Sequence, residues 1–335
     1  MSTSGITIKQ IADMLNISST TVSRVLNGRA RQYRISERTE QLVREAAEKH
    51  HFQPNQIALN LRLNKTNTIG LVIPDISNPF FANLARTAET ALRLRDKMIL
   101  LCDTNDDTVR EKESLQLLMG RKVDGLLVAP VGLSGSHFES FTHIPTVFID
   151  RYFTELPIPF VATDNFQGAY EATEYLIKKG HRHITCIQGL ELTVSNRERV
   201  KGFTEAMKDH GLPMLDDQVV GDDFSIANGH SAMLKLASKN RPTAIFALNN
   251  QIAIGAMQAI HELGLRIPQD VSIISFDEQP YFELTAPPVT TVRQPVAEIG
   301  EAAVQSLFDL MEGKNVVPKL LPPALIERKS VMGID

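Results

Sequence analysis

The sequence predicts an α/β protein in which a small N-terminal head of three helices precedes a body of two subdomains with parallel sheets. Three observations support this prediction. The first fifty or so residues carry short helical patterns, strand-length apolar runs alternate with amphipathic helices from Thr68 onward, and this alternation runs through two rounds. The length of 335 residues also exceeds what one ordinary core supports.

The segment from Thr7 to Asn27 has the pattern of two short helices separated by a tight break. Thr7 and Gln10 have the T-x-x-Q spacing of a capping box, and Ser18 can cap the second helix. Apolar residues at helical spacing predict one shared core. They are Ile8, Ile11, Ala12, Leu15, Val22, Val25 and Leu26.

The outer face of the second helix is unusual for a solvated helix. It consists of Ser19, Thr20, Ser23 and Arg24, with no carboxylate. Small residues permit close approach to DNA, hydroxyls can bond phosphates or base edges, and arginine can bind a guanine edge through two hydrogen bonds. This face predicts a helix that enters the major groove, and an ordinary helical hairpin at the end of a domain is the alternative.

A basic loop, Gly28–Arg34, follows these two helices, and Ser36 can cap a third. The apolar face of the third helix is expected at Leu42, Val43, Ala46 and Ala47. The segment PNQIALNLR, which begins at Pro54, is shorter than the ~12–15 residues at which an isolated helix becomes marginal. We expect it to fold only when it packs on a partner, and a plain linker is the alternative.

Charge is distributed unevenly along the chain. Residues 1–66 contain ten Lys or Arg and five Asp or Glu, which gives this segment +5, and the whole chain carries −4, so the remainder carries −9. A basic head on an acidic body is the asymmetry expected of a module that binds a polyanion and is fused to a second function.

The body shows the alternation of strands and helices that indicates parallel sheets covered on both faces. Strands are expected at 69–74, 98–102, 123–129, 145–150, 184–189, 244–248 and 271–276. Helices are expected at 78–93, 108–119, 169–179, 200–210, 225–238 and 252–263. Gly180, Gly211 and Gly264 follow helix ends as C-caps. Ligands of such sheets bind beyond the carboxyl ends of the strands, so a cleft between the two subdomains is the expected site.

Polar and aromatic residues gather near these strand ends. Carboxylates and amides can hydrogen-bond vicinal hydroxyls, and an aromatic ring can stack on the apolar face of a sugar or base. The set contains Asp75, Asn78, Phe80, Phe81, Asp103, Asn105, Asp150, Arg151, Asp164, Asn165, Asn196, Arg197, Arg199, Asn249, Asn250 and Asp277. Any single Asp or Asn is equally explained as a helix cap, whereas the whole set favours ligand binding.

The chain closely resembles the LacI/GalR family of bacterial transcription regulators. The resemblance runs from about Ile6 to the C-terminal end and is carried by TIKQIADMLNISSTTVSRVLN, PNQIALNLR, IGLVIPDISNPFF, RERVKGF and ISFDE. It implies a helix-turn-helix head over 1–53, a hinge helix or linker over 54–66, and a periplasmic-binding-protein-like body over 67–335 that binds the effector and dimerises. The subdomains are expected at about 67–162 with 293–321 and about 163–292 with 322–335, with crossovers near Ala162, Val292 and Leu321.

The resemblance also implies the function. Such a protein binds a near-palindromic operator in double-stranded DNA as a homodimer, usually represses transcription, and is controlled allosterically by a small metabolite, here expected to be a sugar or sugar derivative, in the cleft. The implied base-reading residues are Ser19, Thr20 and Arg24, and the implied phosphate contacts are Thr7, Thr21, Ser23 and Asn27. In the hinge, Leu61 matches a minor-groove wedge with Ala58 packed below it, and Asn55 belongs to the same DNA-binding motif. The implied effector-binding residues are Asp75, Phe80, Phe81, Asp164, Arg199, Asn249 and Asp277.

Three departures from the family pattern qualify this picture. The loop GRARQYR, at Gly28–Arg34, is longer than in the lac repressor and looks like that of the fructose- and sucrose-responsive branch. Asn250 stands where aspartate is commoner, which puts the details of hydroxyl binding in doubt. No heptad-repeat helix follows Ile326, so we expect a dimer and not a tetramer joined through such a tail.

Other functional classes find less support in the sequence. It contains no G-x-G-x-x-G, P-loop, G-x-S-x-G or H-E-x-x-H motif, so we expect neither an enzyme nor a cofactor. His181 and His183 lack further ligands nearby and are expected in a turn and not at a metal. The pairs Asp106-Asp107, Asp216-Asp217 and Asp222-Asp223 are interpreted as solvated loops. A free sugar-binding protein would have the same body but would need an export signal and no basic head.

The sequence also predicts a cytoplasmic protein with no membrane segment. No apolar run approaches the ~20 residues that span a bilayer. The N-terminus lacks an apolar stretch followed by a small-residue cleavage site, so no export signal is expected. Cys102 and Cys186 are far apart in sequence and are expected as separate thiols in a reducing compartment.

Overall fold

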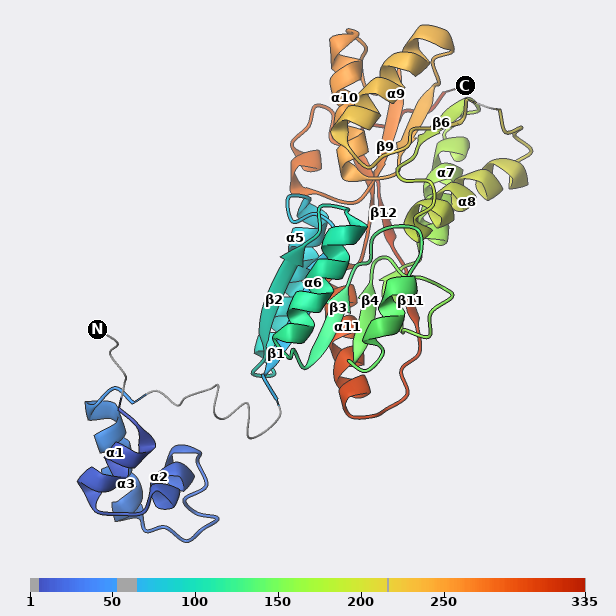
Figure 1. Ribbon diagram of the computed structural model, residues 1–335. Coiled ribbons are helices and arrows are strands. Elements are labelled where there is room, and N and C mark those ends of the chain that lie inside the picture. Colours follow the sequence, from blue (N-terminus) through green and yellow to red (C-terminus); the bar gives the residue numbers. More distant parts are fainter. Residues whose placement is uncertain (1–5, 53–64, 216, 335) are drawn as a thin grey trace. The chain divides into compact units, whose positions relative to one another are not determined.

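The computed structural model describes residues 6–52, 65–215 and 217–334 (Figure 1). It divides into two compact units, Met1–Thr66 and Asn67–Asp335. The predicted hinge segment, with Asn55, Ala58 and Leu61, lies outside the described residues.

The head contains the three expected helices, α1 (Ile8–Leu15), α2 (Ser19–Leu26) and α3 (Glu37–Lys49). Both hydrogen bonds of the predicted capping box between Thr7 and Gln10 are present, and Ser18 and Ser36 cap the next two helices. The small core consists of Ile11, Ala12, Val22, Val25, Ala30, Val43 and Ala47. The prediction for Leu42 was wrong, because its side chain is 46% exposed on the outer side of α3.

The first subdomain of the body is a six-stranded sheet in the order β11-β5-β4-β3-β1-β2, with every neighbouring pair parallel. Its strands are β1 (Thr68–Ile73), β2 (Met98–Asp103), β3 (Gly125–Val128), β4 (Thr146–Ile149), β5 (Phe160–Thr163) and β11 (Lys319–Leu321). Its helices are α5 (Pro79–Arg93), α6 (Thr108–Gly120) and α11 (Val296–Met311), with a 3-10 turn at Ser136–Phe141.

The second subdomain repeats this plan with a sheet in the order β12-β10-β9-β8-β6-β7, in which only the edge pair β10–β12 is antiparallel. Its strands are β6 (Ile184–Ile187), β7 (Val219–Val220), β8 (Ala244–Ala247), β9 (Ser272–Phe276), β10 (Thr290–Arg293) and β12 (Ala324–Ile326). Its helices are α7 (Asn165–Lys178), α8 (Val194–Asp209), α9 (Ile226–Lys239) and α10 (Asn250–Glu262), with a 3-10 turn at Pro280–Glu283.

Helices cover both faces of each sheet, as the continuous apolar strands predict. In β1, Ile69, Leu71 and Ile73 pack toward α5 and α11, whereas Val72 joins the core under α6. In the second subdomain α7 and α8 pair on one face and α9 and α10 on the other (Figure 1). The predicted fold class, a helical head with a two-subdomain α/β body, is therefore confirmed.

The chain passes between the subdomains three times, after β5, after β10 and after β11. Each crossing is short, and the third consists of Pro322 and Pro323 between β11 and β12. These three connections lie beside the carboxyl ends of both sheets. The strand-end loops of the two subdomains therefore lie opposite one another.

Some elements differ from the sequence prediction. Helix α8 begins at Val194 and not near Val200, so Arg199 lies inside a helix and does not precede one. Strands β5, β7, β10, β11 and β12 and helix α11 were not predicted. The expected glycine C-caps were right, since Gly180, Gly211 and Gly264 all have positive φ angles.

Candidate functional site

The predicted DNA-contacting face of the head is accessible around the start of α2. Ser19 and Thr20 are exposed, and Arg24 is half-buried on the next turn. The Arg24 guanidinium stacks 3.8 Å from the centroid of the Tyr33 ring, which comes from the basic loop. A tyrosine under the guanidinium restricts its rotamers, so the loop has a role in positioning Arg24 that the sequence did not reveal.

Local hydrogen bonds orient the remaining polar residues of this face. The Thr7 hydroxyl is bonded to Gln10 within the capping box. The hydroxyls of Ser18 and Thr21 lie 2.8 Å apart, and the Asn27 amide donates to the backbone carbonyl of Ser23 at 2.7 Å. Of the residues predicted to contact phosphates, Thr7 caps α1, Thr21 and Ser23 lie within α2, and Asn27 is the C-cap of α2.

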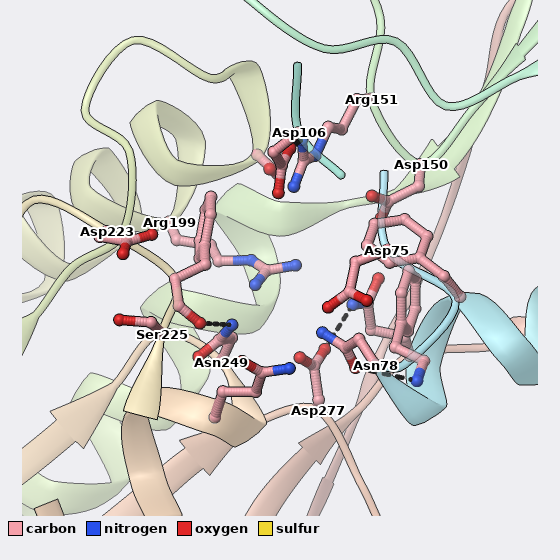
Figure 2. A pocket seen from close by; sticks show the side chains of 16 residues that line it. Asp75, Asn78, Asp106, Asp150, Arg151, Arg199, Asp223, Ser225, Asn249 and Asp277 are labelled. Carbon is pink, nitrogen blue, oxygen red and sulfur yellow. Dashed lines mark hydrogen bonds and ion pairs between the residues drawn. The ribbon is translucent and has the colours of Figure 1, made fainter. Parts of the chain in front are cut away.

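A cavity of about 160 Å³ lies between the two subdomains of the body at the carboxyl ends of the sheets (Figure 2). Six of the seven residues predicted to bind an effector line it: Asp75, Phe80, Phe81, Arg199, Asn249 and Asp277. The other lining residues are Asn78, Asp106, Asp150, Arg151, Ser195, Asp223, Phe224, Ser225, Gln251 and Gln294.

The placement of Asp164 in the cleft was wrong. This residue is the N-cap of α7, and its carboxylate accepts a hydrogen bond of 2.9 Å from the backbone N–H of Gln167. Its side chain does not line the cavity formed by the described residues. The helix-capping role, which explains any single Asp after a strand, holds here.

Arg199 is the central cation of the cavity and extends from α8 toward its middle (Figure 2). Its Nε donates to Asn165 Oδ1 at 2.7 Å, and one terminal nitrogen donates to the Leu248 carbonyl at 2.6 Å. The guanidinium also stacks 3.7 Å from the centroid of Phe276. Burial lowers the pKa of Arg199, and the nearby carboxylates Asp277 and Asp150 oppose that shift.

Arg151 is the second cation of the cavity, and it is paired within its own subdomain. Its guanidinium donates to Asp106 Oδ1 at 2.6 Å. It lies 5.6 Å from the ring centroid of Phe81 and 5.5 Å from that of Phe224. Since Phe81 belongs to α5 and Phe224 to the loop before α9, this arginine connects aromatic groups of both subdomains.

Asp150 is a buried carboxyl of the cavity with a raised pKa. Its side chain is buried, and Oδ1 has no hydrogen-bond partner among the described residues. Burial raises the pKa of Asp150 to about 6, while Arg151 and Arg199 act against this rise. An unpaired buried acceptor is costly, and a hydroxyl group of a ligand would satisfy it.

Asp277 is oriented by two protein donors. The Gln294 side-chain amide donates to Asp277 Oδ1 at 2.6 Å, and the backbone N–H of Asn250 donates to Oδ2 at 3.3 Å. Gln294 lies just after β10, at the second passage between the subdomains, and its other terminal atom accepts from the Thr163 hydroxyl at the first passage. The cavity floor is thus tied to two of the three connecting segments.

The side-chain amides of Asn78 and Asn250 form a hydrogen bond between the two subdomains. The Asn250 side chain donates to Asn78 Oδ1 at 3.2 Å and to the Tyr281 hydroxyl at 3.3 Å. Asn78 caps α5 in the first subdomain, whereas Asn250 is the first residue of α10 in the second. An aspartate at position 250 would have only acceptor oxygens to place against Asn78 Oδ1, which is itself an acceptor. The side-chain N–H of Asn250 therefore makes this contact possible.

The interpretation of two aspartate pairs as solvated loops was right, since Asp106, Asp107, Asp222 and Asp223 are all exposed outside helices and strands, but one member of each pair has a further place that the sequence did not show. Asp106 and Asp223 both line the cavity, one paired with Arg151 and the other beside Ser225. Their neighbour Asp107 caps α6, and Asp222 does not line the cavity. Spacing in the sequence could not separate the two members of each pair, because only the convergence of distant loops gives one of them a role.

The histidines singled out in the sequence have structural partners. His181 bonds to the Thr243 hydroxyl at 2.9 Å and to the Met332 carbonyl at 3.1 Å in the turn before β6. Within the described residues, no three His, Cys, Asp or Glu side chains are grouped as a metal site. The same residues also include no helix with the length and apolar character needed to cross a bilayer.

Comparison with known proteins identifies the family. The family model of bacterial regulatory proteins, lacI family, matches residues 7–55, and a model of the periplasmic binding protein-like domain matches residues 173–331. The HTH-type transcriptional regulator DegA of Bacillus subtilis (strain 168) is 37% identical, over 98% of this chain and 99% of its own length. The chain belongs to the LacI family. As a LacI-family member it is a DNA-binding transcription regulator and not an enzyme.

Further similar proteins support this family assignment and the fold. The HTH-type transcriptional repressor PurR of Pectobacterium atrosepticum is 35% identical, over 97% of this chain and 96% of its own length. A LacI family transcriptional regulator from Enterococcus faecium, solved with bound ribose, is 30% identical with a TM-score of 0.73, over 80% of this chain and 100% of that one. A lac repressor dimer bound to operator is 24% identical with a TM-score of 0.89 over 98% of this chain and 99% of that one, which supports the fold.

Proposed function

We propose that this LacI-family protein is a repressor that binds a near-palindromic operator as a homodimer and responds allosterically to a sugar or sugar derivative. One observation carries the effector part of the proposal. The cavity is lined by side chains of both subdomains, and the passage segments that join the subdomains hold its floor. A ligand there contacts both halves and therefore favours one arrangement of them over another.

The proposed division of labour follows from the chain. Residues 1–53 read DNA through Ser19, Thr20 and Arg24, with phosphate contacts from Thr7, Thr21, Ser23 and Asn27. Residues 54–66 act as the hinge, with Leu61 as the minor-groove wedge, Ala58 packed below it and Asn55 as a further DNA-binding residue. Residues 67–335 bind the effector and dimerise. The accessible start of α2 and the +5 charge of residues 1–66 support the first of these assignments.

A sugar-type effector is supported by the chemistry of the cavity. Carboxylates and amides accept hydrogen bonds from vicinal hydroxyls, and Phe80, Phe81 and Phe224 offer apolar surfaces to carbon-bound hydrogens. The relative from Enterococcus faecium was solved with bound ribose. A coupling of about 1–3 kcal/mol between effector and DNA would change operator affinity five- to 150-fold.

The proposal is tested by selecting duplexes from a random DNA library with the full-length protein and then titrating the selected duplex. An enriched near-palindrome, bound with two protein chains per duplex and with an affinity that one sugar changes at least fivefold, is the expected result. Binding of one chain to a site without internal symmetry would contradict the homodimer. An affinity that no sugar alters would contradict the allosteric control.

The hinge has its own test. We expect Leu61→Ala to weaken binding to the selected operator far more than binding to random duplex, because a minor-groove wedge acts only where the DNA can be kinked. Fluorescence anisotropy with both duplexes measures the two losses, and Leu63→Ala, a change of the same size just beyond the PNQIALNLR motif, is the control. Equal losses on operator and random DNA would count against the wedge.

A further inference from the structure

We propose that the cavity selects an uncharged polyhydroxylated ligand, such as a free sugar, and rejects the phosphate ester of the same sugar. The proposal refines the proposed function by naming the charge class of the effector. It rests on the formal charge of the lining residues, the engagement of both guanidinium groups and the unpaired carboxylate oxygen of Asp150.

The lining is acidic. It contains the five carboxylates of Asp75, Asp106, Asp150, Asp223 and Asp277, but only the two guanidinium groups of Arg151 and Arg199, and the described lining includes no lysine or histidine. The formal sum with all groups ionised is −3. Even with Asp150 protonated it remains −2, so the sign does not depend on the state of that one carboxyl.

Both cations already have partners. Arg151 is paired with Asp106 at 2.6 Å, and both side chains stay on the first subdomain's side of the cavity. Arg199 donates one N–H to Asn165 Oδ1 and another to the Leu248 carbonyl, and its charge interacts with the carboxylates of Asp150 and Asp277. A phosphate group would have to compete with these carboxylates for the positive charge of the same guanidinium groups, and the strong arginine–phosphate pairs are frequently bidentate.

Helix N-termini reduce this negative charge without reversing it. Helices α5, α8, α9 and α10 all begin at the cavity, and each N-terminus is equivalent to roughly half a positive charge. Four such termini offset about two of the three excess charges. At three of them the side chain of Asn78, Ser225 or Asn249 already accepts from a backbone N–H of the first turn.

The same arrangement suits neutral hydroxyl groups. Asp150 lines the cavity, and its buried Oδ1 has no partner among the described residues, so this carboxylate has acceptor capacity left for a ligand hydroxyl that reaches it. A phosphate ester adds a charge of about −1.5 to −2 at neutral pH, and in its dianionic form the phosphate has no hydrogen to donate to this carboxylate. The energy gained from the sugar hydroxyls is therefore opposed by like-charge repulsion when the phosphate is present.

Matched pairs of ligands test this directly on the full-length protein. D-ribose is compared with D-ribose 5-phosphate, D-glucose with D-glucose 6-phosphate, and D-fructose with its 1- and 6-phosphates, first by thermal shift and then by titration calorimetry. We expect at least one free sugar to bind, and its phosphate ester to bind at least about tenfold more weakly. A phosphate ester that binds as tightly as its free sugar, or a panel in which no free sugar binds, would overturn the proposal.

A charge variant tests the cause of the selectivity. Asp223→Asn removes one lining charge and should narrow the difference in affinity between free sugar and ester. Asp222→Asn, at the neighbouring residue that is also exposed but lies outside the lining, should leave that difference unchanged. An equal effect of both variants would refute a local electrostatic cause. These measurements use no DNA, so a sugar that binds without changing operator affinity would refute the allosteric function and leave the charge selectivity intact.

Discussion

Arg199 is held by partners on several sides, and this explains what its removal should do. Truncation to alanine leaves Asn165 Oδ1 and the Leu248 carbonyl without this donor and removes a nearby positive charge from Asp150 and Asp277. Breaking such a buried charged network typically costs about 3–5 kcal/mol. The loss falls on the body, since none of these partners belongs to the head.

We therefore expect Arg199→Ala to abolish the response to effector and to leave operator affinity without effector within about twofold of the parent. Calorimetry with the effector and anisotropy with operator DNA measure the two quantities. Arg197→Ala, an exposed arginine on the same helix outside the cavity lining, is the matched control. If thermal denaturation shows that the alanine variant is unfolded, Arg199→Lys replaces it, and loss of operator binding by a folded variant would contradict the assignment.

Asp150 gives the cavity a dependence on pH. Its pKa is about 6 in the folded protein and near 3.8 in an exposed chain, so the folded state holds this proton more tightly. The contribution of Asp150 to stability therefore improves as the pH falls from about 7 to about 4 and is lost again as the pH rises. A ligand hydroxyl that donates to the carboxylate stabilises the ionised form, so ligand binding should expel the proton.

Effector affinity should accordingly fall as the pH drops through 6. For one proton with a pKa of about 6, binding at pH 5.5 is expected to be about fourfold weaker than at pH 7.5. Calorimetry at the lower pH should show about one proton released per bound effector in buffers of different ionisation enthalpy. Asp150→Asn should remove this proton release, and an unchanged release in that variant would assign it to another group.

Several residues that line the cavity were predicted from the sequence. Asp75, Phe81, Arg199, Asn249 and Asp277 were found because each follows a strand end or matches a family motif, and the topology brings strand ends together. Asp106 and Asp223 were not found, since nothing in the local pattern separates them from the solvated aspartates beside them. Their role depends on which loops converge, and this is a long-range property.

At the scale of elements, α8 shows that the start of a helix is missed by apolar periodicity when its buried side is polar. Its first two turns bury Ser195, Asn196 and Arg199, so the inward side of the helix is polar where an apolar stripe would be expected. Periodicity of apolar residues therefore predicted a start near Val200 instead of Val194. By contrast, α11 has a regular apolar face at Ile299, Ala303, Val304 and Leu307, so its omission came from ending the alternation at β9 and not from a lack of pattern.

Helix α8 also packs closely against α7, and Gly202 makes this approach possible. A Cβ at this position would lie 2.3 Å from the Phe166 carbonyl oxygen and 2.9 Å from the Tyr170 backbone nitrogen. Backbone atoms cannot move aside as a flexible side chain can. The two helices can therefore pair at this distance only with glycine at the contact, and the contact lies one turn beyond Arg199.

We expect Gly202→Ala to destabilise the body by about 1–3 kcal/mol and to weaken effector binding, because α8 must move away from α7 and carries Arg199 with it. Gly120→Ala is the control, because among the described residues no neighbouring atom lies within 4 Å of where its Cβ would be. That change should be neutral or slightly stabilising. Chemical denaturation and calorimetry compare the two variants, and equal stability of both would show that the helices tolerate separation.

At the scale of the whole molecule, charge separates the two functions. The +5 of residues 1–66 attracts the DNA backbone, while the −9 of the remainder repels it. We therefore expect the electrostatic part of DNA affinity to come from residues 1–66, which include the head and the hinge segment. The acidic body limits non-specific contact between the effector-binding subdomains and nucleic acid.

Operator affinity should fall steeply with salt, with a slope in log–log form of about 0.9 for each phosphate contacted. Replacing Arg31 of the basic loop with Gln should reduce that slope by about one if the side chain contacts a phosphate. Binding of an uncharged sugar to the same protein should change little over this range of salt, which provides the internal control. Operator affinity that is independent of salt would contradict recognition through the basic head.

The path of the chain through the body has a consequence for protein synthesis. Helix α11 supplies Ile299, Ala303, Val304 and Leu307 to the core of the first subdomain, yet the ribosome makes it only after the strands and helices of the second subdomain from β6 to β10. While the nascent chain is being elongated, β3, β4 and β5 therefore expose the apolar surface that α11 later covers. During this interval the unfinished half is a natural substrate for chaperones, and the second half has most of its own core before the first is closed.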